Sequence, residues 1–116
     1  MSTGPPVELH PYDPAWPTMF EEEKERLVAI LAPFLEGGIE HVGSTAVPGL
    51  AAKPVIDIIA GVRSLDVARA ALPALEAAQY CSFDYRPEMH WFCKPSPDVR
   101  TILVEVRGRR PPRTSH

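Results

Sequence analysis

Small and polar residues between His41 and Asp57 have the types and the order expected of a phosphate-binding site. The turn Gly43-Ser44-Thr45 follows a short apolar run, and such a turn offers backbone N–H groups and a hydroxyl to a phosphate. Lys53, near the end of the same loop, adds a point charge suited to phosphate. Asp57 lies in the next apolar run, where a carboxylate beside a phosphate-binding loop would hold a magnesium ion. This segment is therefore the candidate functional centre.

The run Val55-Ile56-Asp57-Ile58-Ile59 surrounds one carboxylate with apolar side chains. Burying an ionised carboxylate is costly unless a charge or a hydrogen-bond donor pairs with it. The candidate partners are Lys53, Ser44 and a bound cation. The alternative is a structural aspartate that is satisfied by hydrogen bonds alone.

Two further residues each have a chemical and a structural interpretation. His41 stands beside the turn, where it contacts phosphate or serves as a base, or else is a structural histidine. Glu105 lies in a later apolar run, where it supplies a second carboxylate for a metal or is an exposed strand residue. The catalytic candidates are accordingly Asp57 and His41, and the metal-binding candidates are Asp57 and Glu105.

One long helix is predicted to precede this segment. Asp13 is expected as its N-cap and Pro14 as its first residue. The acidic run from Glu21 to Glu25 is expected on a solvated helix face, and Gly37-Gly38 is expected to end the helix. The buried face is predicted from apolar residues at helical spacing: Trp16, Phe20, Leu27, Leu31, Phe34 and Leu35.

Short apolar runs predict several strands, at residues 7–9, 39–42, 55–62, 83–85, 90–94 and 101–106. The run at 55–62 is expected to be covered on both faces of the sheet. A second helix is expected after Ser64, with Leu65, Ala68, Leu72 and Leu75 on its apolar stripe and Pro73 interrupting it. The order of these elements predicts an α+β fold, a mixed sheet with flanking helices.

Composition narrows the class of protein. The chain has 116 residues and a formal net charge of −3, which fits one domain and makes nucleic acid an unlikely partner. Cys81 and Cys93 form no metal-ligand spacing and are interpreted as reduced thiols. No apolar run is long enough to span a membrane, and no secretory signal is visible, so a cytoplasmic protein is expected. A homodimer is compatible with the small size.

The stretch from Ile39 to Ile58 closely resembles the signature of the GrpB-like family, and residues 11–16 are similar to that family's opening. The resemblance extends over about residues 7–106. It implies a nucleotidyltransferase-like fold and a magnesium-dependent nucleotidyl transferase acting on a nucleotide. One domain is expected at residues 1–106, followed by a basic tail at 107–116 that is expected to be disordered, because its composition becomes rich in Gly, Arg and Pro.

Two departures from the superfamily pattern keep other functions open. A second acid is expected two residues after Asp57, but that position is Ile59, and two-metal transfer needs carboxylates that bridge two cations. The helical region that usually follows the last strand has no counterpart here. The alternatives to an enzyme are a catalytically inactive nucleotide- or phosphate-binding module, and a structural or interaction domain.

Overall fold

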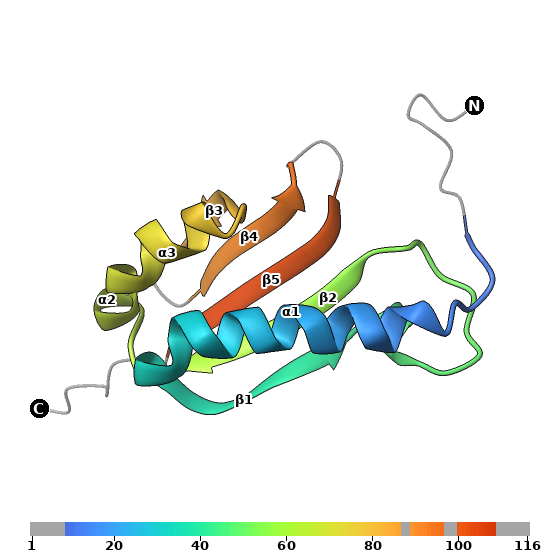
Figure 1. The fold of residues 1–116 in the computed structure, drawn as a ribbon, viewed down its shortest axis with the longest axis horizontal. Helices are drawn as coiled ribbons and strands as arrows, with labels where there is room; N and C mark the ends of the chain where they lie inside the picture. The colour runs from blue at the N-terminus through green and yellow to red at the C-terminus, as the bar shows by residue number, and fades with distance from the viewer. Residues whose placement is uncertain (1–8, 87–88, 97–99, 109–116) are drawn as a thin grey trace, which may run out of the picture.

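The computed structural model describes residues 9–86, 89–96 and 100–108. Five strands form one sheet in the order β1-β2-β5-β4-β3. The strands are β1 (Leu35–Val42), β2 (Ile56–Val62), β3 (Cys81–Tyr85), β4 (Met89–Pro95) and β5 (Arg100–Gly108). Only the central β2–β5 pair is parallel within this described sheet, whereas the three other neighbouring pairs are antiparallel. The predicted α+β fold with a mixed sheet is confirmed (Figure 1).

Helix α1 (Ala15–Leu31) lies along β1 and β2 (Figure 1). It begins one residue later than predicted, with Pro14 at the N-cap position, while the Asp13 carboxylate accepts a hydrogen bond of 2.8 Å from the Ala15 N–H. One expectation for this helix is wrong, because Glu23 is buried while its acidic neighbours are exposed. Glu23 lies on the same helix stripe as the buried Phe20 and Leu27, so helical periodicity indicates that Glu23 is buried.

The end of α1 also differs from the prediction. The helix stops at Leu31 and a 3₁₀ turn, η1 (Ala32–Phe34), leads into β1. Pro33 cannot donate a backbone hydrogen bond, which ends the α-helical ladder there. The pair Gly37-Gly38 lies inside β1, at an irregularity in its pairing with β2, and Gly37 has φ +90°. These glycines therefore form a bulge in a strand rather than a helix end.

The second helical region is divided as its proline predicts. It consists of α2 (Leu65–Ala68), the 3₁₀ turn η3 (Arg69–Ala71) and α3 (Leu72–Ala77), with Pro73 in the first turn of α3. Ser64 occupies the N-cap position of α2 but makes no capping hydrogen bond through its side chain. The apolar stripe of this region packs on the same face of the sheet as α1.

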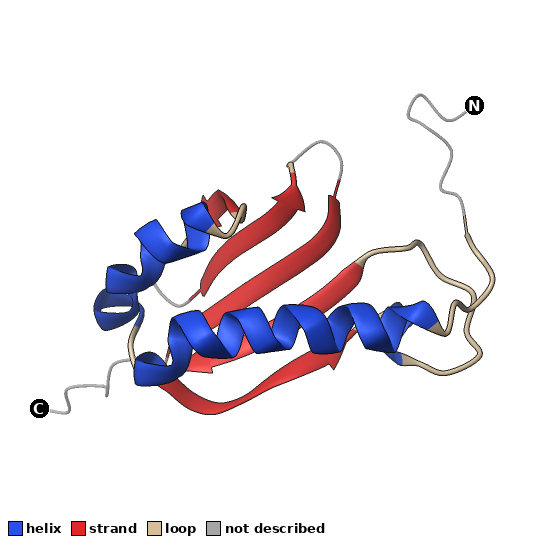
Figure 2. Ribbon diagram, viewed as in Figure 1, coloured by secondary structure: helices blue, strands red, loops and turns tan. Residues whose placement is uncertain are grey.

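Helices cover one face of the sheet, and this arrangement decides where the site lies (Figure 2). Along β2, Ile56, Ile58, Ala60 and Val62 are buried against the helices, whereas Asp57, Ile59 and Gly61 are partly exposed on the other face. The prediction that this strand is covered on both faces is therefore wrong for the described part of the chain. We call the uncovered side, which carries Val42, Asp57, Ile59, Leu103, Glu105 and Trp91, the open face.

Some predicted boundaries shift. Residues 7 and 8 of the predicted edge strand lie outside the described residues, and Leu9 is not in a strand, although His10 forms a single β-bridge with Ala52. At the other end, β5 continues through Gly108, two residues past the predicted domain limit. Arg107 is therefore part of the sheet, and residues 109–116 lie outside the described residues. No described helix is long and apolar enough to cross a bilayer.

Candidate functional site

The open face brings together residues that are far apart in the sequence. Val42 lies opposite Asp57 across the β1–β2 pair, and Asp57 lies opposite Leu103 across β2–β5. One step along the strands on the same face, Ile59 lies opposite Glu105, which lies opposite Trp91. Because side chains alternate between faces of a sheet, the two rows stand side by side on the open face. Asp57 and Ile59 therefore share one face of β2, while Ile56 and Ile58 occupy the other.

The turn after β1 closes directly over Asp57. Gly43 has φ +76°, and a Cβ atom added to it would lie only 2.6 Å from Oδ2 of Asp57. A short 3₁₀ turn, η2 (Ser44–Ala46), follows, and the Ala46 N–H donates to the Gly43 carbonyl. Glycine is required here both for the backbone conformation and for the contact with the carboxylate. The predicted proximity of the Gly43 turn to Asp57 is present.

The Asp57 carboxylate is half-buried and lacks a stabilising partner. Among the residues that the structure describes, no hydrogen bond or ion pair reaches its oxygens. Burial therefore acts alone and raises the pKa of Asp57 above its ordinary value. A cation or a hydrogen-bond donor that binds beside the ionised Asp57 carboxylate would stabilise it.

Glu105 faces the same region from the neighbouring strand. Its Oε2 accepts a 2.7 Å hydrogen bond from Nε of Arg107, and the Glu105 side chain is 16% exposed. A cavity of about 270 Å³ joins these groups to Asp57. It is lined by Val42, Gly43, Asp57, Ile58, Ile59, Trp91, Leu103, Glu105 and Arg107. Two carboxylates and one guanidinium therefore share a single cavity on the open face.

His41 lies on the helix-covered side of β1, away from this cavity. Its ring stacks on Phe20 of α1 with the centroids 5.0 Å apart, and Nε2 lies 2.9 Å from Oγ1 of Thr45. The Thr45 hydroxyl donates to the Val55 carbonyl, so it accepts from His41. Burial lowers the pKa of His41 and favours the neutral ring. The structure thus ties His41 and Thr45 to the core of the turn and does not bring His41 to Asp57.

Ser44 and Lys53 are both exposed at the surface of the loop. Neither lines the cavity that contains Asp57. Their predicted contact with phosphate stays a prediction. Of the candidate partners for Asp57, neither Lys53 nor Ser44 pairs with it among the described residues.

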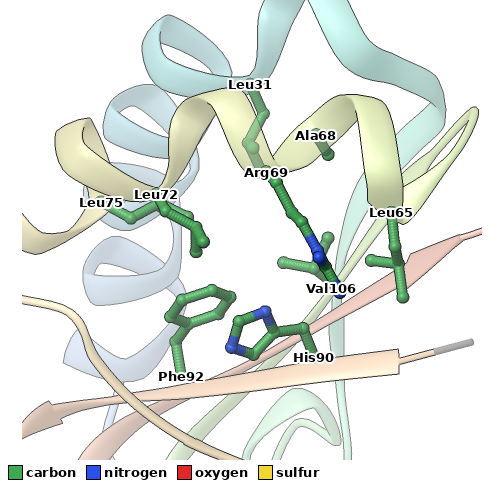
Figure 3. A pocket seen from close by; sticks show the side chains of 9 residues that line it. All are labelled: Leu31, Leu65, Ala68, Arg69, Leu72, Leu75, His90, Phe92 and Val106. Atoms are coloured by element: carbon green, nitrogen blue, oxygen red, sulfur yellow. The ribbon is translucent and has the colours of Figure 1, made fainter. Parts of the chain in front are cut away.

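A second hollow lies under the helices. Figure 3 shows Arg69 of η3 and His90 of β4 pointing into this hollow, with the Phe92 ring beside His90. His90 stacks on Phe92 at 4.2 Å, and its Nε2 lies 2.5 Å from the Ser82 hydroxyl. The hollow holds only about 10 Å³, which is no more than the space that one water molecule needs. The open-face cavity is the better candidate for a ligand.

Sequence reasoning missed two residues of the cavity. Trp91 carries no functional signal in the sequence, and Arg107 falls within the predicted basic tail. The alternation along β4 and β5 places Trp91 and Arg107 on the face of Glu105. Within the described ranges, no group of three or more His, Cys, Asp or Glu could hold a metal ion. Any cation site here is limited to Asp57 and Glu105 and needs oxygen ligands from a bound molecule.

These features define a class of protein: an α+β domain with helices on one face of a mixed sheet and a cavity with two carboxylates on the other. The sequence matches the family model described as GrpB protein over residues 6–115. The chain belongs to the GrpB family, and the resemblance seen in residues 39–58 is confirmed.

Similar proteins support this assignment. A crystal structure of a conserved GrpB protein from Enterococcus faecalis matches with a TM-score of 0.78 and 32% identity, covering 87% of this chain and 61% of that one. A UPF0157 protein from Halalkalibacterium halodurans is 40% identical over 87 residues, covering 74% of this chain and 43% of that protein. A dephospho-CoA kinase from Mycobacterium bovis is 42% identical over 78 residues, covering 65% of this chain and 19% of that protein. The chain therefore spans less than two thirds of each of these relatives.

Proposed function

We propose that the open-face cavity binds the magnesium-complexed phosphate groups of a nucleotide, as the ligand-binding part of a nucleotidyltransferase-like protein. The observation that carries the proposal is the half-buried Asp57 carboxylate, which lies against the Gly43 turn with no partner among the described side chains. A fold that leaves an ionised group in this state gains stability when a ligand supplies the missing charge.

The donor set of the cavity suits magnesium. Magnesium prefers six oxygen ligands and is commonly held by one or two carboxylates, with phosphate and water completing the shell. Asp57 and Glu105 lie diagonally on neighbouring strands, so both can reach one ion. Arg107 is held beside Glu105 and offers N–H donors to phosphate. A bound ion would neutralise phosphate charge, while Asp57, Glu105 and Arg107 orient the ligand.

Nucleotidyl transfer is the second candidate function. In that reaction an acceptor oxygen bonds to the α-phosphorus while the bond to the pyrophosphate oxygen breaks. Glu105 favours this candidate because it adds a carboxylate to the cavity of Asp57. Ile59 favours binding without turnover, since an apolar residue stands where a second bridging carboxylate is expected. Binding of a magnesium–nucleotide complex is common to both candidates and is tested first.

The test is a thermal-shift titration with a nucleoside triphosphate, with and without magnesium. Wild type should show a magnesium-dependent rise in the unfolding midpoint, because a ligand that binds only the folded state stabilises it. Asp57→Asn should abolish the rise and Glu105→Gln should reduce it. Glu25→Gln, which removes an exposed charge from α1, is the matched control and should behave as wild type.

Two results would contradict the proposal. A magnesium-dependent rise that persists in Asp57→Asn would place the cation elsewhere. Absence of any rise with nucleoside triphosphates would exclude the nucleotide. Inorganic triphosphate is the third arm of the experiment, because a rise equal to that of the nucleotide would show that only the phosphate groups are recognised.

A further inference from the structure

The two cysteines of the chain lie directly opposite each other in the sheet. Cys81 opens β3, and Cys93 is its register partner in β4. They are separated by a whole β-hairpin in the sequence, so their spacing gave no sign of this pairing. Both are free thiols, Cys81 half-buried and Cys93 fully buried.

The geometry of the ladder permits a covalent link. Cα atoms of directly opposite residues in an antiparallel pair are about 4.5–5.5 Å apart, and disulfides span Cα distances of about 4.4–6.8 Å. Their Cβ atoms are about 4.5–5.5 Å apart, against about 3.5–4.5 Å in a disulfide, so an approach of up to about 1 Å closes the gap. β3 is an edge strand, which makes that approach possible without moving the centre of the sheet.

The two thiols differ in their access to a small oxidant, because Cys81 is partly exposed and Cys93 is buried. Sγ of Cys81 makes only a weak 3.5 Å hydrogen bond, to the Pro95 carbonyl, which is easily given up. Burial raises the pKa of Cys93 above its ordinary value, and the nearby charge of Arg100 offsets this only in part, so Cys93 stays a protonated thiol. The accessible thiol is Cys81, and the buried thiol beside it is placed to resolve the oxidised form.

We propose that Cys81 and Cys93 form a reversible disulfide when the folded protein meets a peroxide. The Cys81 thiolate attacks the peroxide, so that an S–O bond forms, the O–O bond breaks and water leaves after protonation. Sulfur of Cys93 then attacks the resulting sulfenic acid, the S–S bond forms and a second water leaves. The two thiols are oxidised by two electrons and one hydrogen peroxide is reduced to two waters. A dithiol reductant reverses the reaction.

The pair lies in line with the candidate site. Cys93 is the register partner of Leu103, and Leu103 is the register partner of Asp57. The disulfide therefore crosses the same face of the sheet, in the same row as the Asp57 carboxylate. Its formation does not depend on the proposed nucleotide binding.

The experiment treats the folded chain with hydrogen peroxide and measures intact mass and thiols that can be alkylated after denaturation. Wild type should lose two hydrogen atoms in mass and both alkylatable thiols, as a monomer on a non-reducing gel, and dithiothreitol should restore both. Cys81→Ser and Cys93→Ser are the matched controls, and neither should show the loss of two hydrogens. The same reaction in urea should be at least about tenfold slower, because only the folded sheet holds the thiols together.

Three outcomes would overturn the proposal. In the first, the peroxide-treated wild type keeps both alkylatable thiols. In the second, it loses them only through cross-linked dimers. In the third, the intramolecular link forms as fast in urea as in native buffer, which would show that the register of β3 and β4 contributes nothing.

Discussion

The two faces of the sheet each hold a carboxylate away from water, and the fold treats the two in opposite ways. On the helix-covered face, Glu23 receives hydrogen bonds from the Tyr80 hydroxyl at 2.5 Å and from Nζ of Lys94 at 2.9 Å, and it pairs with Arg26. On the open face, Asp57 has no such partner among the described residues. The comparison separates a carboxylate that holds the fold together from one that the fold leaves available.

The electrostatic consequences differ in sign. Burial raises the pKa of Glu23, but the hydrogen bonds from Tyr80 and Lys94 and the charges of Lys94 and Arg26 outweigh it and hold the pKa below its ordinary value. Burial also raises the pKa of Asp57, and there nothing opposes it. The charge of Glu23 therefore stabilises the folded state, whereas the charge of Asp57 costs stability until a ligand arrives.

The largest expected effect is the loss of the Glu23 charge. Glu23→Gln leaves the Lys94 ammonium without its carboxylate and should lower the free energy of unfolding by about 2–4 kcal/mol at neutral pH. Because the folded pKa of Glu23 is lowered, the stabilisation is complete above the ordinary glutamate pKa and disappears as pH falls through the folded value. Urea titrations at several pH values measure this. Glu22→Gln, exposed on the same helix, is the control, and an equal loss in both variants would remove the distinction.

Gly43→Ala should produce the next largest effect, and it tests the open face. The positive φ at this position costs a residue with a side chain about 1–3 kcal/mol, and the new Cβ would clash with Oδ2 of Asp57. Both stability and magnesium-dependent ligand binding should fall. Gly49→Ala is the matched control, since Gly49 also has a positive φ but its added Cβ meets nothing within 4 Å. Binding lost equally in both variants would show that loop strain, and not the carboxylate, is responsible.

Tyr80→Phe tests how much the Tyr80 hydroxyl contributes to the Glu23 cluster on the helix-covered face. It removes one donor to Glu23 while Lys94 keeps its contacts with Glu23 and with the aromatic ring, whose centroid is 4.0 Å from Nζ. The free energy of unfolding should fall by about 1–2 kcal/mol, less than for Glu23→Gln. Chemical denaturation measures the difference, with Tyr12→Phe at the start of the chain as the control. A loss as large as that of Glu23→Gln would mean that the Tyr80 hydroxyl, rather than the ion pair, dominates the cluster.

The smallest effect should have the opposite sign. Asp57→Asn should raise the unfolding midpoint of the ligand-free protein by no more than a few degrees at neutral pH, because it removes an unpaired charge. Since the folded pKa of Asp57 is raised, this cost is present above the folded value and vanishes as pH falls below the ordinary aspartate value. Calorimetry at neutral and acidic pH checks both ends. A destabilised variant at neutral pH would reveal a partner for the Asp57 charge.

Local patterns in the sequence predict the helices and strands better than they predict the contacts between them. The helix from Ala15, the strand around Asp57 and the interruption at Pro73 each follow from spacing within a few residues. The cluster of Glu23, Tyr80 and Lys94 could not be predicted in this way, because its members come from α1, the segment before β3, and β4. Only the packing of the helix on the sheet brings their charges together.

The candidate site shows the same limit. Gly43 and Asp57 could be placed near each other because consecutive strands usually pair. For Glu105 the sequence allows both a metal-binding and an exposed-strand interpretation, because no pattern near it shows that β5 inserts beside β2. Trp91 was missed for the same reason, and Gly37-Gly38 was misread because glycine pairs mark both helix ends and strand bulges.

The position of β5 has a consequence for how the chain acquires its site. β1 and β2 pair with each other, and so do β3 and β4, but the strand synthesised after all of these lies between the two pairs (Figure 1). A nascent chain that has not yet released residues 100–108 contains two separate hairpins with exposed inner edges, a state prone to association. Glu105 reaches the cavity that contains Asp57 only when β5 pairs with β2 and β4. Completion of the sheet and formation of the cavity are therefore a single event.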